Sequence, residues 1–175
     1  PPRPELGKGP RTGFFPGSTI GNLTPELAVR FLTSAHDRLG PGSHFILGVD
    51  LVKPVELLVA AYDDAEGVTA AFNLNLLERA NRELGADFDP DGFRHRAVWN
   101  PERSRMEMHL VSTRDQTVTL DGTAIRFLEG ETLHTESSRK FTREAVVELV
   151  EKAGWRLVEW RESKAPAVAL ALLQG

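Results

Sequence analysis

Hydrophobic positions along the chain change their period several times, and these changes outline the expected fold. Phe14 and Phe15 open a short strand, and residues 45–52 form a near-continuous apolar run of strand length. Such a run is typical of a central parallel strand that is covered on both faces. Apolar residues at helical spacing follow each strand, which predicts an α/β sheet with ligands at its carboxyl edge.

Four helices are expected from start and stop signals around these periodic stretches. Thr24 is the predicted N-cap of the first helix, Pro25 stands at its first position, and Gly40 ends it. Gly85 ends the third helix, and Thr142 caps the last one. The expected helices are 25–39, 54–62, 66–84 and 142–153.

After residue 92 the hydrophobic period becomes two, which predicts antiparallel strands. Residues 93–99 are expected to pair with a strand at 106–110, and Asp121 with Gly122 is a tight-turn signal inside a second hairpin. Two further strands, 155–160 and 167–173, end the chain. The expected domains are a flexible lead-in at 1–13, a Rossmann-like α/β part at 14–85 and 134–175, and an antiparallel lobe at 86–133.

Composition narrows the classes of protein that fit this pattern. The chain has 175 residues, 41% hydrophobic and 26% charged, with a net charge of −4 and scattered basic residues, so nucleic acid is not the expected partner. It has no cysteine, which excludes disulfides and thiolate chemistry. No apolar run approaches the length of a membrane span, and no signal peptide is visible. A cytoplasmic enzyme or binding domain is expected.

Polar residues cluster where the first two strands end. Gly17 and Gly21 frame a turn in which glycine permits positive φ and close approach of a ligand, and Asn22 offers both a donor and an acceptor. The alternative is that Asn22 only closes the turn before the Thr24 cap. Asp50 ends the second strand at the same edge, where its carboxylate could bind an amine or a sugar hydroxyl, or merely cap a turn.

Two further places carry candidate chemistry. Tyr62 is the only tyrosine, and its phenol can hold a carboxylate without being charged, although a tyrosine at a helix end is commonly part of the core. In the segment 134–141, Glu136 and Ser138 would project to one side of an extended chain and could bind the two nitrogens of an imidazole. A polar loop before the helix is the simpler interpretation of this segment.

Other enzyme classes find no support in the sequence. The five histidines lack H-x-x-x-H and H-E-x-x-H spacing, so no metal site is expected. No G-x-S-x-G elbow supports a serine hydrolase. No G-x-G-x-x-G-like loop precedes the first strand, where a nucleotide cofactor would normally be held.

Several motifs together resemble one family. GSTIGNL (17–23), GVDLVK (48–53), AYDDAEGVTAAFN (61–73), the hairpin containing MEMHL (106–110) and HTESSRKF (134–141) are similar to the carboxyl-terminal half of the histidine-specific Nα-methyltransferases of ergothioneine biosynthesis. The resemblance runs from about residue 14 to the end, in the family's order. It implies part of a class I S-adenosylmethionine-dependent methyltransferase fold with an antiparallel substrate-binding lobe. It also implies three methyl transfers to the α-amino group of histidine, giving hercynine.

The resemblance also implies roles for single residues. Asn22 would contact the amino and carboxylate end of histidine, with Gly17 in the nearby turn. Tyr62 would hold the carboxylate, and Glu136 and Ser138 would grip the imidazole. Asn22 and Tyr62 are the catalytic candidates, while residues that bind the cofactor are not identified. The remaining implied pocket residues are Thr69, Phe72 and Met108.

The sequence departs from the family in lacking its amino-terminal half, with the glycine-rich cofactor loop. We therefore expect the chain to be a truncation, or to be complemented by a partner that supplies that half, and to have little activity alone. Pro16 also suggests that the first strand is short or at a sheet edge. Two alternatives are a non-catalytic amino-acid or betaine binding module and a related methyltransferase for another amino acid.

Overall fold

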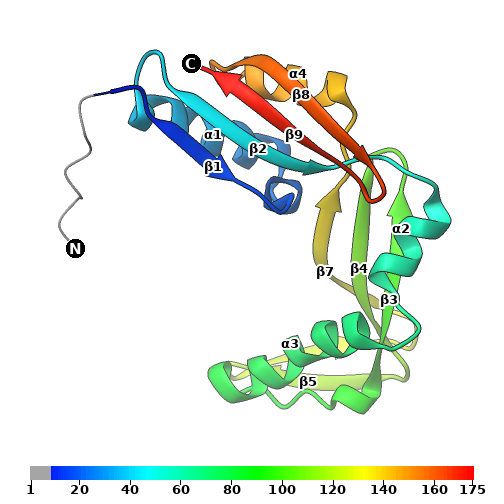
Figure 1. Cartoon of the computed structure of the whole chain (residues 1–175). Coiled ribbons are helices and arrows are strands. Elements are labelled where there is room, and N and C mark those ends of the chain that lie inside the picture. The colour runs from blue at the N-terminus through cyan, green and yellow to red at the C-terminus, as the bar shows by residue number, and fades with distance from the viewer. Residues whose placement is uncertain (1–8) are drawn as a thin grey trace. The chain divides into compact units, whose positions relative to one another are not determined.

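The computed structural model describes residues 9–175, which form two compact units (Figure 1). The first unit contains the chain up to Val52 together with Arg139–Gly175, and the second contains Lys53–Ser138. The first eight residues of the expected lead-in lie outside the described residues, and the first strand begins within that lead-in, at Thr12. Between residues 9 and 175, no helix combines the length and the apolar character needed to cross a membrane.

A four-stranded sheet organises the first unit. Its strands, in spatial order, are β1 (Thr12–Phe15), β2 (His44–Asp50), β9 (Ala167–Gln174) and β8 (Arg156–Lys164). β1 is short and lies at the edge of the sheet, as Pro16 suggested. β2 is an interior strand, but only its pairing with β1 is parallel, because β9 runs antiparallel to it. The strand expected to be central and parallel is therefore interior and parallel to β1, but its other neighbour, β9, is antiparallel.

Two helices cover this sheet, and both begin at the expected caps. In α1 (Pro25–Leu39), the Thr24 hydroxyl accepts a hydrogen bond from the Leu27 N–H. In α4 (Arg143–Glu151), the Thr142 hydroxyl accepts from the Ala145 N–H. These contacts satisfy N–H groups that the first turn of a helix leaves without a partner, which fixes where each helix starts.

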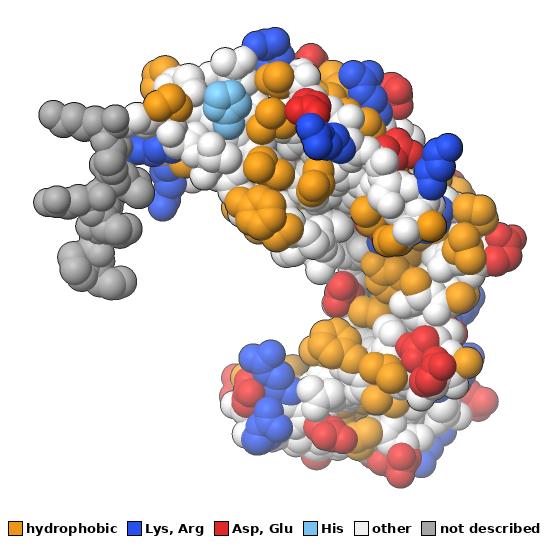
Figure 2. All heavy atoms as spheres, viewed as in Figure 1, with side chains coloured by type: hydrophobic (Ala, Val, Ile, Leu, Met, Phe, Trp, Pro, Cys, Tyr) orange, Lys and Arg blue, Asp and Glu red, His pale blue; other side chains and the backbone are white. Residues whose placement is uncertain are grey.

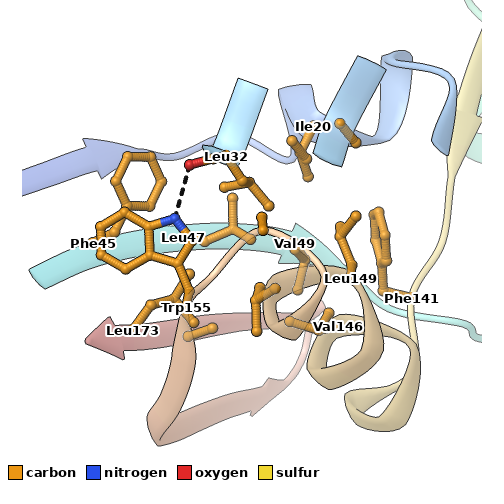
Figure 3. Close-up of a cluster of buried hydrophobic side chains, with 14 of the residues drawn as sticks. Ile20, Leu32, Phe45, Leu47, Val49, Phe141, Val146, Leu149, Trp155 and Leu173 are labelled. Carbon is orange, nitrogen blue, oxygen red and sulfur yellow. Dashed lines mark hydrogen bonds between the residues drawn. The ribbon is translucent and has the colours of Figure 1, made fainter. Parts of the chain in front are cut away.

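The core of the first unit lies between these helices and the sheet (Figure 3). Leu32 of α1 and Val146 of α4 are fully buried against Leu47 of β2. Trp155 is also buried, and its indole N–H donates a 2.9 Å hydrogen bond to the carbonyl oxygen of Leu32. A buried indole needs such an acceptor, so this bond fixes the loop after α4 to α1.

The second unit combines helices with antiparallel strands. Its sheet has the order β3 (Phe93–Asn100), β4 (Arg105–Ser112) and β7 (Thr132–Arg139), and β5 (Gln116–Leu120) pairs with β6 (Thr123–Phe127) in a separate hairpin. The helices are α2 (Val55–Tyr62) and α3 (Val68–Leu84), with a short 3-10 turn, η2 (Pro90–Gly92). The hairpins confirm the change of period seen in the sequence. The two helices, expected with the α/β part, belong to this unit.

Two features of the second unit differ from what the pattern suggested. The segment 134–141 is mostly strand β7, so the simpler interpretation as a polar loop is wrong. The apolar stripe of α3 is largely exposed: Val68 is 69% and Phe72 61% accessible, whereas Leu77 and Asn73 are buried. Figure 2 shows hydrophobic side chains gathered on the surface over α3. The polar Asn73 is thus on the packed face, where hydrophobic periodicity would not have placed it.

Candidate functional site

A hydrogen bond joins two of the predicted site residues in the second unit. Tyr62 is the last residue of α2, and its hydroxyl donates to Oγ of Ser138 on β7 over 2.7 Å. Ser138 is 6% exposed. The sequence separation of 76 residues means that only the tertiary fold brings these two groups together. The predicted carboxylate-binding phenol and the predicted imidazole-binding hydroxyl are therefore direct neighbours.

Strand β7 also carries Glu136 and lies beside Met108 of β4. The Thr135 hydroxyl donates to the carbonyl oxygen of Met108 over 2.9 Å, which ties β7 to β4 and leaves Met108 buried beside it. Glu136 lies two residues before Ser138, and alternation along a strand places these two side chains on the same side. Glu136 and Ser138 therefore lie on an extended segment and project to one side of it, as the sequence predicted.

Thr69 and Phe72 lie on the first turns of α3. The N–H groups of Val68 and Thr69 donate to the two carboxylate oxygens of Asp64, over 2.9 and 2.8 Å. The Thr69 hydroxyl also hydrogen-bonds to this carboxylate, and together these bonds lower the pKa of Asp64 from 3.8 to about 2. Thr69 therefore helps to start the helix, whereas the exposed ring of Phe72 is available to a ligand or to a covering segment.

Gly17 and Asn22 belong to the first unit, at the carboxyl edge of β1 and β2. Asn22 is the last residue of a 3-10 turn, η1 (Thr19–Asn22), and Gly17 adopts a positive φ of 74° just before it. Oγ of Ser18 accepts a 2.8 Å hydrogen bond from the Asp50 N–H, which fixes the turn to the end of β2. A loop at this edge is where α/β sheets bind ligands.

A buried ion pair lies beneath this turn. The Lys140 ammonium is 2.7 Å from a carboxylate oxygen of Asp50, and the Lys140 side chain is 1% exposed. Asp50, singled out as a ligand candidate, is thus engaged in the fold of the first unit. The turn also approaches the chain before Lys140 closely, because a Cβ on Gly21 would lie 2.7 Å from the carbonyl oxygen of Arg139. The sequence shows Lys140 only as one of two bases in HTESSRKF, with no sign that it is buried.

The predicted site residues are therefore divided between the two units, and within each unit some of them are close to one another. In the second unit Tyr62 contacts Ser138, Glu136 precedes Ser138 by two residues on β7, and Met108 lies on the adjacent strand β4; in the first unit Gly17 and Asn22 share one turn. That the two groups converge on one ligand stays a prediction. Among the residues described, no three His, Asp or Glu side chains are arranged to hold a metal ion.

Comparison with known proteins places this geometry in a family. Residues 2–175 match the family model described as "Histidine-specific methyltransferase, SAM-dependent". The chain is 47% identical to histidine N-alpha-methyltransferase of Mycolicibacterium smegmatis, over 96% of this chain and 54% of that protein. It is 45% identical to the protein of the same name from Mycobacterium tuberculosis, over 96% of this chain and 53% of that protein.

A more distant relative carries the name of a pathway. Ergothioneine biosynthesis protein 1 of Neurospora crassa is 30% identical over 82% of this chain and 16% of its own length. The chain spans about half the length of the two mycobacterial relatives. The α/β sheet of the first unit and the antiparallel strands of the second agree with the expected fold, part of a Rossmann-like methyltransferase with an antiparallel lobe. This chain belongs to the family of histidine-specific, S-adenosylmethionine-dependent methyltransferases.

Proposed function

We propose that this chain forms the histidine-binding part of an enzyme that methylates the α-amino group of histidine three times, giving hercynine for ergothioneine biosynthesis. Identity of 47% to a curated histidine N-alpha-methyltransferase over almost the whole chain supports the substrate. The observation on which the proposal depends is the hydrogen bond between Tyr62 and Ser138, since it joins two of the proposed ligand-binding groups into one site.

The proposed site has a suitable partner for each polar group of histidine. Glu136 accepts a hydrogen bond from one imidazole N–H, and Ser138 bonds to the other ring nitrogen. The phenol of Tyr62 has a single proton: in the complex it donates that proton to the substrate carboxylate and accepts a hydrogen bond from the Ser138 hydroxyl, the reverse of its direction in the chain alone. Asn22 holds the amino end through a neutral amide, which leaves the nitrogen lone pair free to react.

Positioning supplies most of the rate in this proposal. The amine must be deprotonated and about 3 Å from the methyl carbon, in line with the bond that breaks, and a rigid site provides that arrangement in advance. Removal of water from the amine favours its neutral form. When bound, S-adenosylmethionine supplies the electrophilic methyl group. The chain's own residues hold and orient the acceptor.

A complementing amino-terminal half is part of the proposal, and it would carry the main cofactor-binding loop. The proportion of the mycobacterial relatives that this chain spans supports it. The edge of the first unit's sheet supports it as well. In the part of the chain that the structure describes, β1 pairs with β2 alone, and its residue Phe14 is 65% exposed. An open strand edge with an exposed aromatic ring is a surface on which further strands can be added.

Calorimetry and a methylation assay test the proposal together. L-histidine is titrated into the chain alone, and into the chain mixed with the part of the Mycolicibacterium smegmatis protein that it does not match, with and without S-adenosylmethionine. We expect histidine to bind in at least the mixture of the two parts, and hercynine to form in that mixture when S-adenosylmethionine is present. Absence of histidine binding in every sample would refute the proposal.

The same experiment separates the alternatives. Because the chain spans about half the length of its two mycobacterial relatives, a binding module without catalysis is the second candidate. Histidine or hercynine binding that does not depend on the cofactor, with no methylation in the mixture, would favour that module. Methylation of another amino acid in place of histidine would favour a related methyltransferase.

A further inference from the structure

The carbonyl oxygen of Tyr62 needs a donor from outside its helix. Tyr62 ends α2, and the last four carbonyl groups of a helix have no partner within it. His95, on β3, meets this need: its Nε2 lies 2.8 Å from the Tyr62 carbonyl oxygen. The main chain of Tyr62 is therefore held by a histidine while its hydroxyl is held by Ser138.

Asn73 determines which nitrogen of His95 carries the proton. Asn73, on α3, is completely buried, and its amide nitrogen lies 2.9 Å from Nδ1 of His95 and 3.1 Å from the carbonyl oxygen of His109. A carbonyl oxygen can only accept, so the amide must direct its nitrogen, not its oxygen, at His109. The second hydrogen of that nitrogen then points at Nδ1 of His95, which must accept.

The tautomer of the neutral His95 ring follows from this contact. Nδ1 is unprotonated, so a neutral ring carries its proton on Nε2 and donates it to Tyr62. The orientation of Asn73 has a cost, because its buried side-chain oxygen has no hydrogen-bond partner among the described residues. The reverse orientation would place two oxygens against each other at His109. The two contacts of the amide nitrogen therefore favour the observed arrangement despite that cost.

We infer that Asn73 and His95 are positioning residues for Tyr62. They form a chain of hydrogen bonds, here called the relay, in which the Asn73 amide donates to the His109 carbonyl oxygen and to the His95 ring, and the His95 ring donates to the Tyr62 carbonyl oxygen. The relay links β4, α3 and β3 to the end of α2, so it fixes the point from which the phenol extends. Its effect on ligand binding rests on the proposed function, whereas the relay itself depends only on the second unit.

The first test is the tautomer of His95 in the unmodified chain. In a ¹⁵N-histidine-labelled sample, we expect the His95 signals of a ring protonated on Nε2 and unprotonated on Nδ1, identified by their loss in His95→Gln. A proton on Nδ1 would overturn the inference. This readout requires neither histidine binding nor methylation, so it is informative even where the proposed function fails.

The second test uses Tyr62 as its own reporter, because it is the only tyrosine in the chain. A sample labelled with ¹³C in tyrosine gives one set of ring signals. His95→Leu removes the donor and should shift or broaden that set, whereas His95→Gln keeps an N–H near the position of Nε2 and should restore it. His44→Leu, in the other unit, is the matched control and should leave it unchanged. Unchanged Tyr62 signals in His95→Leu would contradict the inference.

The functional consequence is measured by titration of L-histidine. His95→Leu should weaken histidine binding about tenfold, the loss that corresponds to one hydrogen bond, and His95→Gln should bind within about threefold of the unmodified chain. Urea unfolding of both variants checks that they remain folded. Equal affinities of the Leu and Gln variants would exclude the positioning role. If the unmodified chain fails to bind histidine both alone and mixed with the complementing half, the proposed function is refuted, and the two spectroscopic tests still decide whether Asn73 and His95 hold Tyr62.

Discussion

The hydroxyl of Tyr62 donates a 2.7 Å hydrogen bond to Oγ of Ser138, and this contact joins the end of α2 to strand β7. The family resemblance assigns these two residues to different parts of one ligand. Their contact means that a change at either one affects the other, so the proposed carboxylate and imidazole positions are coupled.

Removal of the Tyr62 hydroxyl should therefore destabilise the chain and reduce the loss of stability that Ser138→Ala causes. Tyr62→Phe is expected to lower the free energy of unfolding by about 1 kcal/mol, the usual net value of one hydrogen bond. In urea unfolding, Tyr62→Phe and Ser138→Ala together should cost less than the sum of the single losses, because both remove the same bond. Strictly additive losses would show that the bond contributes nothing.

Asp64 should stabilise the start of α3 in a way that depends on pH. Its carboxylate accepts from two N–H groups of the helix, and its pKa is lowered from 3.8 to about 2. Its contribution is therefore complete well above the ordinary pKa of 3.8 and is lost as pH falls through the folded value of about 2. Asp64→Ala should lower Tm at neutral pH, and the difference from the unmodified chain should shrink on acidification towards about pH 2. Asp63→Ala, at the preceding exposed position, is the control and should show no such trend.

The buried pair of Lys140 and Asp50 should be far more sensitive to change than an exposed pair. Asp50→Asn leaves the buried ammonium facing an amide, and we expect a loss of about 3–5 kcal/mol in the free energy of unfolding. Glu159→Gln breaks the exposed pair of Glu159 with Arg161 and should cost less than about 1 kcal/mol. Similar losses for the two variants in urea unfolding would argue against a structural role for the buried pair.

Gly21 should tolerate no side chain. A Cβ there would lie 2.7 Å from the carbonyl oxygen of Arg139, so Gly21→Ala must push the η1 turn away from the backbone. We expect a loss of about 1–3 kcal/mol in stability and weaker histidine binding, since Asn22 would move with the turn. Gly9→Ala meets open space and is the control. A Gly21→Ala variant with unchanged stability and unchanged histidine binding would contradict both the close contact of the turn with Arg139 and the proposed role of Asn22.

Local signals were sufficient to predict most elements of the fold. Thr24 and Thr142 cap helices as their spacing indicated, and Asp121 with Gly122 forms the turn of a hairpin, because these contacts involve neighbours in sequence. The direction of β9 beside β2 could not be read in this way, since an apolar run gives no information about which strand lies next to it. The strand around Glu136 could not be predicted from local signals either, because the polar composition of this segment is typical of a loop.

The site was predictable only in part, for a related reason. The family resemblance proposes Tyr62, Glu136 and Ser138 as site residues, and of these the structure shows a direct contact between Tyr62 and Ser138. Nothing in the sequence indicated that Asn73 and His95 hold Tyr62, because an asparagine within an otherwise apolar helical stretch is usually on the exposed face. Such contacts come from elements that meet only in the folded unit.

The central claim is that the group formed by Tyr62, Glu136 and Ser138 binds histidine, and a titration of L-histidine into Glu136→Gln tests it most directly. The measurement uses this chain with the complementing half of its relatives, and Glu129→Gln, at an exposed position of the same unit, is the matched control. The account predicts that Glu136→Gln weakens histidine binding by about tenfold to a hundredfold, as expected for loss of a charged hydrogen bond, and that Glu129→Gln does not change it. Equal affinities in the two variants would contradict it.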